Sequence, residues 1–477
     1  MTDEIVPDSW QDINYDKDSE KVEMNLIKGI DKIEITETNK ESTTIKPKKS
    51  KKEHINIIFI GHVDAGKSTI GGNIMYNNLY KMALLFCRYL TGMIDKRTLE
   101  KYEREAKELN RESWYLSWAL DINVEERLKG KTAETGRAFF ETKNRRYTLL
   151  DAPGHKLFVS NMVENASQAD VAVLVISARR GEFETGFERG GQTREHAMLA
   201  KTEGIRHLVV AINKMDDQTV NWSNDRYEEI KLKLTPYLKK LGYNTRTDIH
   251  YIPLSGFKGT NVDVIDKKAA PWYEGVSLLQ HLDTLPIRTK CLDYPVRLPI
   301  MGRFKDMGTF ISGKVESGII EKGKTYVIMP NRVQVEIASI TSDDVDSKTA
   351  SANENVSIKL KGVEPEDISA GFVLCCSLNP CSVGTIFDGQ IVIIDGSYMI
   401  TAGFNALMHL HTSVQPITFK NIICTINRKS NKKEKIFPVM IKQDEIAIVR
   451  IVVTNGMVCI EPYSIFPQMG RFVLRNE

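Results

Sequence analysis

The sequence lacks the features that define several large classes of protein. It contains no apolar run of about 18 residues, the length that a membrane-spanning helix needs, so we expect no membrane association. The first residues, MTDEIVPDSW, are acidic and lack the basic start and apolar core of a secretory signal. The seven cysteines are scattered, as is typical of proteins from a reducing compartment. We therefore predict a cytoplasmic protein.

The chain also has little excess charge of either sign. Lys and Arg number 65 against 62 for Asp and Glu, which gives a formal net charge of +3. This value is far below that of a polybasic nucleic-acid coat, so we expect no sequence-specific DNA binding. Cys375, Cys376 and Cys381 are the only cysteine cluster, and no second cysteine pair completes a zinc ligand set. Buried apolar thiols are the favoured interpretation.

The amino-terminal region differs in composition from the rest of the chain. Residues 1–52 are polar and end in the basic stretch KPKKSKK. Such a composition buries too little apolar surface to offset chain entropy, so we predict a disordered arm. The basic stretch is a nuclear address, an RNA-touching patch or a solvated linker, and the linker is favoured because such runs are common beside domains.

Two patterns follow the arm, and they predict three domains. From residue 53 to 286, apolar strands alternate with helical segments: INIIFIG, RYTLLDAPG, ADVAVLVISA, HLVVAINK and HYIPLSG are the strands. This alternation predicts a parallel sheet covered by helices. Short strands separated by turn residues then predict two β-barrels, at 287–386 and 387–477. The fold class is therefore α/β, a P-loop domain with a parallel sheet followed by two all-β barrels.

The stretch GHVDAGKST predicts a phosphate-binding loop. It fits the pattern G-x-x-x-x-G-K-[ST] and stands between a predicted strand and a predicted helix, as the motif requires. The glycines let backbone N–H groups surround the phosphates, Lys67 neutralises the β and γ charges, and Ser68 can ligate Mg²⁺. The predicted phosphate-binding residues are Gly61, His62, Val63, Asp64, Ala65, Gly66, Lys67, Ser68 and Thr69.

A second motif, DAPGH, ends the next predicted strand. Its Asp151 can hold Mg²⁺ through water, and the N–H of Gly154 can meet a γ-phosphate. Thus Ser68 and Asp151 are both candidate metal ligands.

A third motif, NKMD, selects the base. The amide of Asn213 can bond the N7 edge, and the carboxylate of Asp216 accepts from the N1–H and exocyclic amino group that guanine carries together. Adenine offers neither donor, and hydrogen-bonding sites reject such analogues by roughly 10⁴ or more. Lys214 can lie along the base plane, and Ser255 and Gly256 supply a further guanine loop. The motifs together predict a site for GTP.

The order of these domains resembles that of translational GTPases such as elongation factor Tu and eukaryotic elongation factor 1 alpha. Within that group, the chain is most similar to the eukaryotic class-2 peptide chain release factors. The resemblance rests on LTGMIDKRTLEKYEREAKELNRESWYLSWALD, EERLKGKT, GEFETGFERGGQTREHAMLAKT, DMGTFISGKVESG and FPQMGRFVLR, and it covers roughly residues 54–477. Elongation factors usually carry His in place of Ala65.

The resemblance implies a function in translation termination. The protein would bind the class-1 peptide chain release factor through its barrels, deliver it to a ribosome at a stop codon, and hydrolyse GTP to trigger peptide release. Thr132 would reach Mg²⁺ and the γ-phosphate in the GTP state, and His155 would be the catalytic residue that orients the attacking water. We expect a monomer when the protein is free, with GTP or GDP and Mg²⁺ as ligands.

Two alternatives remain open at this point. A ribosome-rescue or tRNA-delivering GTPase would share the architecture and bind a different partner. A non-catalytic binding protein would retain the GTP motifs without turnover, because these motifs indicate binding more strongly than hydrolysis.

The sequence departs from its family at three places. Residues 77–89, NNLYKMALLFCRY, are additional, and they are either an insertion that loops out or extends beyond the domain, or an unremoved intron. Added to a helix, they would displace the next segment of the chain by ~20 Å. Ser160, Glu164 and Asn165 replace the usual Pro and Gly-Gly. The chain stops at Glu477, where relatives usually continue, so we expect the last barrel to lack a strand.

Overall fold

The structure is a computed structural model. It describes residues 52–84, 96–108, 114–118, 136–154, 162, 166–188, 191–286, 292–342, 345–393, 399–427, 432–443 and 445–475. The predicted arm at 1–52 therefore lies outside the described residues, except for Lys52. Among the helices that are described, none combines the length and apolar character needed to cross a membrane.

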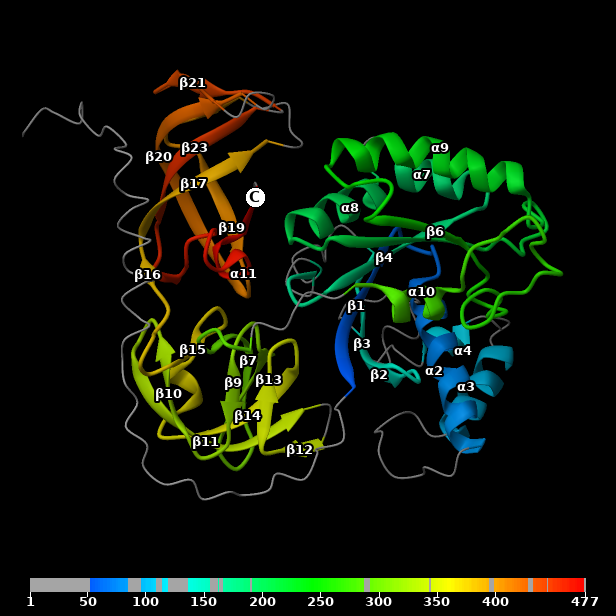
Figure 1. The fold of residues 1–477 in the computed structure, drawn as a ribbon, viewed down its shortest axis with the longest axis horizontal. Coiled ribbons are helices and arrows are strands. Elements are labelled where there is room, and N and C mark those ends of the chain that lie inside the picture. Colours follow the sequence, from blue (N-terminus) through cyan, green and yellow to red (C-terminus); the bar gives the residue numbers. More distant parts are fainter. Residues whose placement is uncertain are drawn as a thin grey trace, which may run out of the picture. The chain divides into compact units, whose positions relative to one another are not determined.

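The first domain contains a six-stranded sheet (Figure 1). Its order is β2 (Gly136–Glu141), β3 (Arg145–Asp151), β1 (Glu53–Gly61), β4 (Val171–Ser177), β5 (His207–Asn213) and β6 (Ile249–Pro253). All neighbours pair in parallel except β2, which is antiparallel to β3. The predicted parallel sheet is thus confirmed, and most of its strands are buried on both faces, which explains their nearly continuous apolar sequences.

Helices cover both faces of this sheet (Figure 1). One face packs on α8 (Gln192–Thr202) and α9 (Asn224–Lys240), beside α7 (Glu182–Phe187), and the other packs on α2 (Lys67–Leu84) and α10 (Leu278–Thr284). Alternation along β1 divides the two cores, because Ile57 and Phe59 face one set while Ile58 and Ile60 face the other. Two further helices, α3 (Lys96–Glu108) and α4 (Trp114–Ser117), pack on each other.

The additional residues 77–89 begin as a continuation of a helix. The phosphate-loop helix α2 runs without interruption to Leu84, so residues 77–84 extend it. Residues 85–89 lie outside the described residues, as do Ser160, Glu164 and Asn165.

The second domain is a closed antiparallel barrel. Its order is β10 (Thr325–Met329), β15 (Val373–Cys376), β7 (Arg297–Lys305), β8 (Thr309–Lys314), β14 (Asn355–Lys361), β11 (Val333–Ser342) and β12 (Val345–Ser347), and β10 also pairs with β11. A second sheet joins β13 (Thr349–Ser351) to β9 (Ile319–Glu321), and Pro365–Asp367 forms the short helix η3. The pairing of β10 with β11 removes the sheet edges that an open barrel would expose.

The third domain is a smaller β structure. Its main sheet has the order β17 (Ile386–Val392), β23 (Ile446–Val453), β20 (Ser413–Ile426), β19 (Asn405–Leu410) and β25 (Phe472–Arg475), with β21 (Lys433–Ile436) on β20. Short pairs join β16 (Val383–Gly384) to β24 (Val458–Cys459) and β18 (Ile400–Thr401) to β22 (Met440–Ile441), and α11 is Pro467–Gly470. Phe387 of β17 and Phe472 of β25 meet edge to face with centroids 5.8 Å apart. Side-chain packing therefore joins the two edge strands of this sheet.

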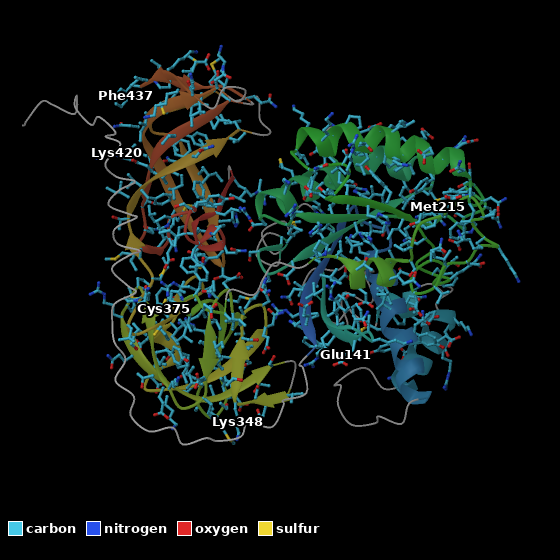
Figure 2. All side chains as sticks on the ribbon, viewed as in Figure 1. Glu141, Met215, Lys348, Cys375, Lys420 and Phe437 are labelled. Carbon is cyan, nitrogen blue, oxygen red and sulfur yellow. The ribbon has the colours of Figure 1, made fainter. Side chains whose placement is uncertain are left out.

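The cysteines that are described carry free thiols. Cys375, Cys381 and Cys459 are buried in one small apolar cluster, and Figure 2 shows Cys375 on the first barrel. The neighbouring thiol of Cys381, together with burial, raises the pKa of Cys375. The thiol of Cys459 and burial raise the pKa of Cys381 against an opposing contribution from Cys375, so both groups remain protonated at neutral pH. The interpretation as buried apolar thiols is therefore confirmed for Cys375 and Cys381, whereas Cys376 is only partly buried.

One buried ion pair connects the second and third domains. Arg297 in β7 donates from Nε to Glu461 at 2.7 Å and from its terminal nitrogens to Asn379. Both charged side chains are less than a tenth exposed. Loss of one member would leave the other charge buried without compensation, which is far costlier than loss of a surface pair.

We predict that Glu461→Ala lowers the free energy of unfolding by about 3–5 kcal/mol. Thermal and denaturant unfolding would measure the loss. The control is Asp388→Ala, which removes the partner of Arg450 in an exposed two-bond pair and should cost much less because water screens it. Equal losses in both variants would contradict the importance of the buried pair.

Candidate nucleotide-binding site

Loops at the carboxyl ends of four parallel strands meet at one edge of the sheet. They follow β1, β3, β5 and β6, and Met215, labelled in Figure 2, marks the loop after β5. A β-carbon at Gly66 would lie 2.3 Å from the side-chain nitrogen of Asn213, and one at Gly256 would lie 2.6 Å from Ile70. The loops are therefore packed too closely to allow a side chain at either glycine. Ligands of parallel α/β sheets commonly bind at this edge of the sheet.

The phosphate-binding loop has an unusual backbone. Gly61 has φ 141°, Gly66 has φ 94°, and Asp64 has φ 59° although it is not glycine. A β-carbon on Gly61 would also lie 2.3 Å from the carbonyl oxygen of Val175. Glycine is thus required at both ends of the loop by conformation and by space, which is the physical basis of the motif.

Lys67 is buried inside this loop. Its Nζ donates to the carbonyl oxygens of His62 at 2.9 Å and Gly61 at 3.2 Å. Burial lowers the pKa of Lys67, while the negative charges of Asp151 and Asp64 oppose that shift. The ammonium group is held beneath the loop, where it can reach phosphate oxygens from a low-dielectric position.

The end of β3 approaches the same loop. A β-carbon on Gly154 would lie 2.7 Å from Nζ of Lys67 and 3.0 Å from the backbone nitrogen of Val63. Asp151, at the end of β3, is fully buried, and its charge acts on Lys67. The second motif and the phosphate loop thus form one continuous surface.

These residues fit a magnesium ion. Ser68 in the first turn of α2 and Asp151 at the end of the adjacent strand both offer oxygen, the donor that Mg²⁺ prefers. No group of three or more His, Cys, Asp or Glu side chains that could hold a metal occurs in the described ranges. Mg²⁺ commonly binds through one or two protein oxygens together with substrate phosphates and water, and this donor set suits that mode.

The side chain of Asn213 connects three loops. Its Nδ2 donates to the carbonyl oxygen of Ala65 at 2.8 Å, and its Oδ1 accepts from the backbone nitrogens of Lys214 and Gly256, both at 2.8 Å. The residue is 3 % exposed. Asn213 therefore fixes the phosphate loop relative to the loops after β5 and β6.

Lys214 is positioned by an acid that the sequence motifs did not reveal. Its Nζ lies 2.7 Å from Glu182, which also accepts a hydrogen bond from Ser177 at 2.6 Å. Burial alone would raise the pKa of Glu182, but the hydrogen bonds from Lys214 and Ser177 outweigh it and lower the pKa. The carboxylate thus stays charged and holds the lysine side chain.

Asp216 also has an oppositely charged neighbour. Nζ of Lys258 lies 3.4 Å from its carboxylate, and the backbone nitrogen of Lys258 donates to Oγ of Ser255 at 3.2 Å. Ser255 is fully buried and its backbone pairs with Thr260. The loop after β6 therefore places a cation beside the carboxylate of Asp216.

The structure brings together the predicted residues that it describes. They are Gly61, His62, Val63, Asp64, Ala65, Gly66, Lys67, Ser68, Thr69, Asp151, Gly154, Asn213, Lys214, Asp216, Ser255 and Gly256. His155 and Thr132 lie outside the described residues. The sequence motifs did not predict that Glu182 and Lys258 are part of the site. Lys258 stands three residues after Ser255 and a search for cations near the guanine loop could have found it, whereas no local signal marks Glu182.

Comparisons with known proteins also indicate a GTP-binding domain. Residues 52–287 match the family Elongation factor Tu GTP binding domain, residues 308–375 match Elongation factor Tu domain 2, and residues 386–477 match GTP-eEF1A C-terminal domain-like. The eukaryotic peptide chain release factor GTP-binding subunit of Kluyveromyces lactis is 50 % identical over 430 residues, which is 89 % of this chain and 59 % of that protein.

Two solved structures extend the comparison. Sup35 complexed with GDP is 39 % identical, with 90 % of this chain and 92 % of that one covered and a TM-score of 0.38. The S. cerevisiae Ski7 GTPase-like domain bound to GTP is 18 % identical, covers 89 % and 93 %, and has a TM-score of 0.67, which shows a shared fold.

The chain spans about three fifths of the length of the release factor subunit from Kluyveromyces lactis. The three matched families nevertheless follow one another in the order of the observed domains. The chain therefore belongs to the elongation factor Tu-like translational GTPases, and within them to the family of eukaryotic peptide chain release factor GTP-binding subunits.

Proposed function

We propose that this chain binds GTP with Mg²⁺ and hydrolyses it to GDP and phosphate. The observation that carries the proposal is the bracing of the phosphate loop by Asn213, the first residue of the guanine motif. Through this amide, the groups that would hold the phosphates and those that would read the base form one connected site. Gly61, Lys67 and Ser68 would hold the phosphates, with Ser68, Asp151 and Thr132 on the metal.

Hydrolysis requires a water molecule aimed at the γ-phosphate. By resemblance to the family, His155 orients this water, and it follows Gly154 directly in the chain. Gly154 packs against the phosphate loop, which supports the placing of the next residue beside the γ-phosphate. The buried ammonium of Lys67 would stabilise charge that develops on the phosphate oxygens.

The proposed biological task is translation termination. The chain would bind the class-1 peptide chain release factor, deliver it to the ribosome at a stop codon, and couple GTP hydrolysis to peptide release. The similarity to release factor GTP-binding subunits across 89 % of the chain supports this role. We further propose that it acts in the cytoplasm and is a monomer when free.

Guanine selectivity can be tested at Asp216. We predict that Asp216→Asn shifts preference from GTP to XTP and weakens GTP binding by roughly 10²-fold or more, because an amide cannot accept from both guanine donors. Competition binding with GTP, XTP and ATP would measure the shift. Lys258→Ala is the matched control, since it removes the neighbour of Asp216 but keeps its carboxylate. Unchanged GTP affinity in the Asp216 variant would refute the assignment.

The catalytic role of His155 can be separated from binding. We predict that His155→Ala lowers the rate of GTP hydrolysis by about 10²-fold or more while the dissociation constants for GTP and GDP change little. Single-turnover hydrolysis and equilibrium binding would be measured on the same samples. A parallel loss of binding would show a structural role instead.

The biological role predicts a dependence on two partners. GTP hydrolysis should accelerate when ribosomes and the class-1 release factor are both present, and less with either alone. A pull-down that recovers aminoacyl-tRNA and not the class-1 factor would favour a tRNA-delivering GTPase. GTP binding without stimulation under any of these conditions would favour a non-catalytic binding protein.

A further inference from the structure

We propose that His196 is a positioning residue for the phosphate-binding loop. Its imidazole accepts a hydrogen bond from the backbone N–H of Gly61 and thereby fixes the conformation in which the loop meets the phosphates. The inference rests on the proposed GTP binding and goes beyond it, because His196 belongs to none of the nucleotide-binding motifs. It lies on α8, 135 residues further along the chain.

The geometry of the contact is well defined. The nitrogen of Gly61 lies 3.0 Å from Nδ1 of His196. Gly61 is the last residue of β1 that pairs with β4, opposite Val175, and its φ of 141° turns the chain away from the sheet. At this point the loop leaves the sheet, and a buried N–H without an acceptor would cost free energy.

The imidazole can act only as an acceptor at Nδ1. His196 is fully buried, and burial, with smaller contributions from Lys67 and His62, lowers its pKa to about 3. The ring is therefore neutral at physiological pH, and its proton resides on Nε2 because Nδ1 accepts from Gly61. Nε2 has no hydrogen-bond partner within the part of the chain that is described. Gly61 is therefore the one hydrogen-bond partner of this imidazole among the described residues.

A second side chain of α8 contacts the same loop. Gln192, one helical turn before His196, places its Oε1 3.4 Å from the backbone nitrogen of Val63. From within the loop, Lys67 donates to the carbonyl oxygens of Gly61 and His62. The loop is thus held through N–H groups by α8 and through carbonyl groups by Lys67. Both sets of contacts limit the directions in which its remaining N–H groups can point.

The acceptor and the bulk of His196 can be removed separately. In His196→Asn the amide oxygen stands the same number of bonds from the backbone as Nδ1 and can accept from Gly61, whereas His196→Leu fills space without an acceptor. Leu199→Ala is the stability control, because Leu199 lies on the same helix in the apolar core and has no polar contact with the loop.

The measurement is the dissociation constant for GDP and for GTP, with thermal unfolding recorded on the same samples. We expect His196→Leu to weaken both nucleotides by roughly tenfold to a hundredfold, and His196→Asn to restore binding to within about threefold of the unmodified chain. Leu199→Ala should lower the unfolding temperature. Both dissociation constants should be unchanged when they are measured below the unfolding temperature of this variant.

Two results would overturn the positioning role. One is wild-type affinity in His196→Leu. The other is equal weakening by the leucine and asparagine variants, which would show that the ring supports the fold and not the hydrogen bond. Failure of the unmodified chain to bind either nucleotide would instead refute the proposed function, so the two failures are distinguishable.

Discussion

The nucleotide site depends on one buried side-chain amide. Asn213 bonds Ala65 in the phosphate loop, Gly256 in the loop after β6, and its own neighbour Lys214. These three loops follow the parallel strands β1, β5 and β6. Backbone hydrogen bonds join the ends of β5 and β6, and the Asn213 side chain adds the bond to the phosphate loop after β1. The amide does so from a fully packed position, where each of its bonds is strong because water is excluded. On the proposed function, a change at this residue would therefore disturb phosphate binding as well as base recognition.

The sequence predicts the parts of this site that are local. Gly61 and Gly66 have the positive φ angles that the motif implies, and the loops that end at Gly154 and Gly256 meet them at the predicted edge of the sheet. Domain order and the parallel sheet were also predictable, because buried strands and amphipathic helices have distinct periods. Contacts across the fold were not predictable. Glu182 and His196 approach the site from segments between the motifs, and only the folded sheet brings them there.

The extension of α2 shows why added length can be compatible with an intact site. Residues 77–84 add about 12 Å of helix at the carboxyl end, and the first turn, which contains Lys67 and Ser68, lies at the opposite end. The expectation was that the added segment either loops out or extends beyond the domain. Over residues 77–84 it does not loop out, because continued backbone hydrogen bonding extends the helix. Ile70 and Ile74 keep the first half of α2 on the sheet, so its register against β1 does not depend on the residues after Asn77.

The same helix that contacts the phosphate loop also contacts the last domain. Glu195 of α8 pairs with Arg475 of β25 at 3.3 Å, and the carbonyl oxygen of Glu203, at the end of α8, accepts from Arg471. These arginines belong to the stretch FPQMGRFVLR, one of the segments on which the resemblance to the release factor family rests. Glu195 and His196 are consecutive in a continuous hydrogen-bonded helix, so a displacement of α8 moves both contacts. One helix thus carries both the contact to Gly61 in the phosphate loop and the contact to β25 in the last domain.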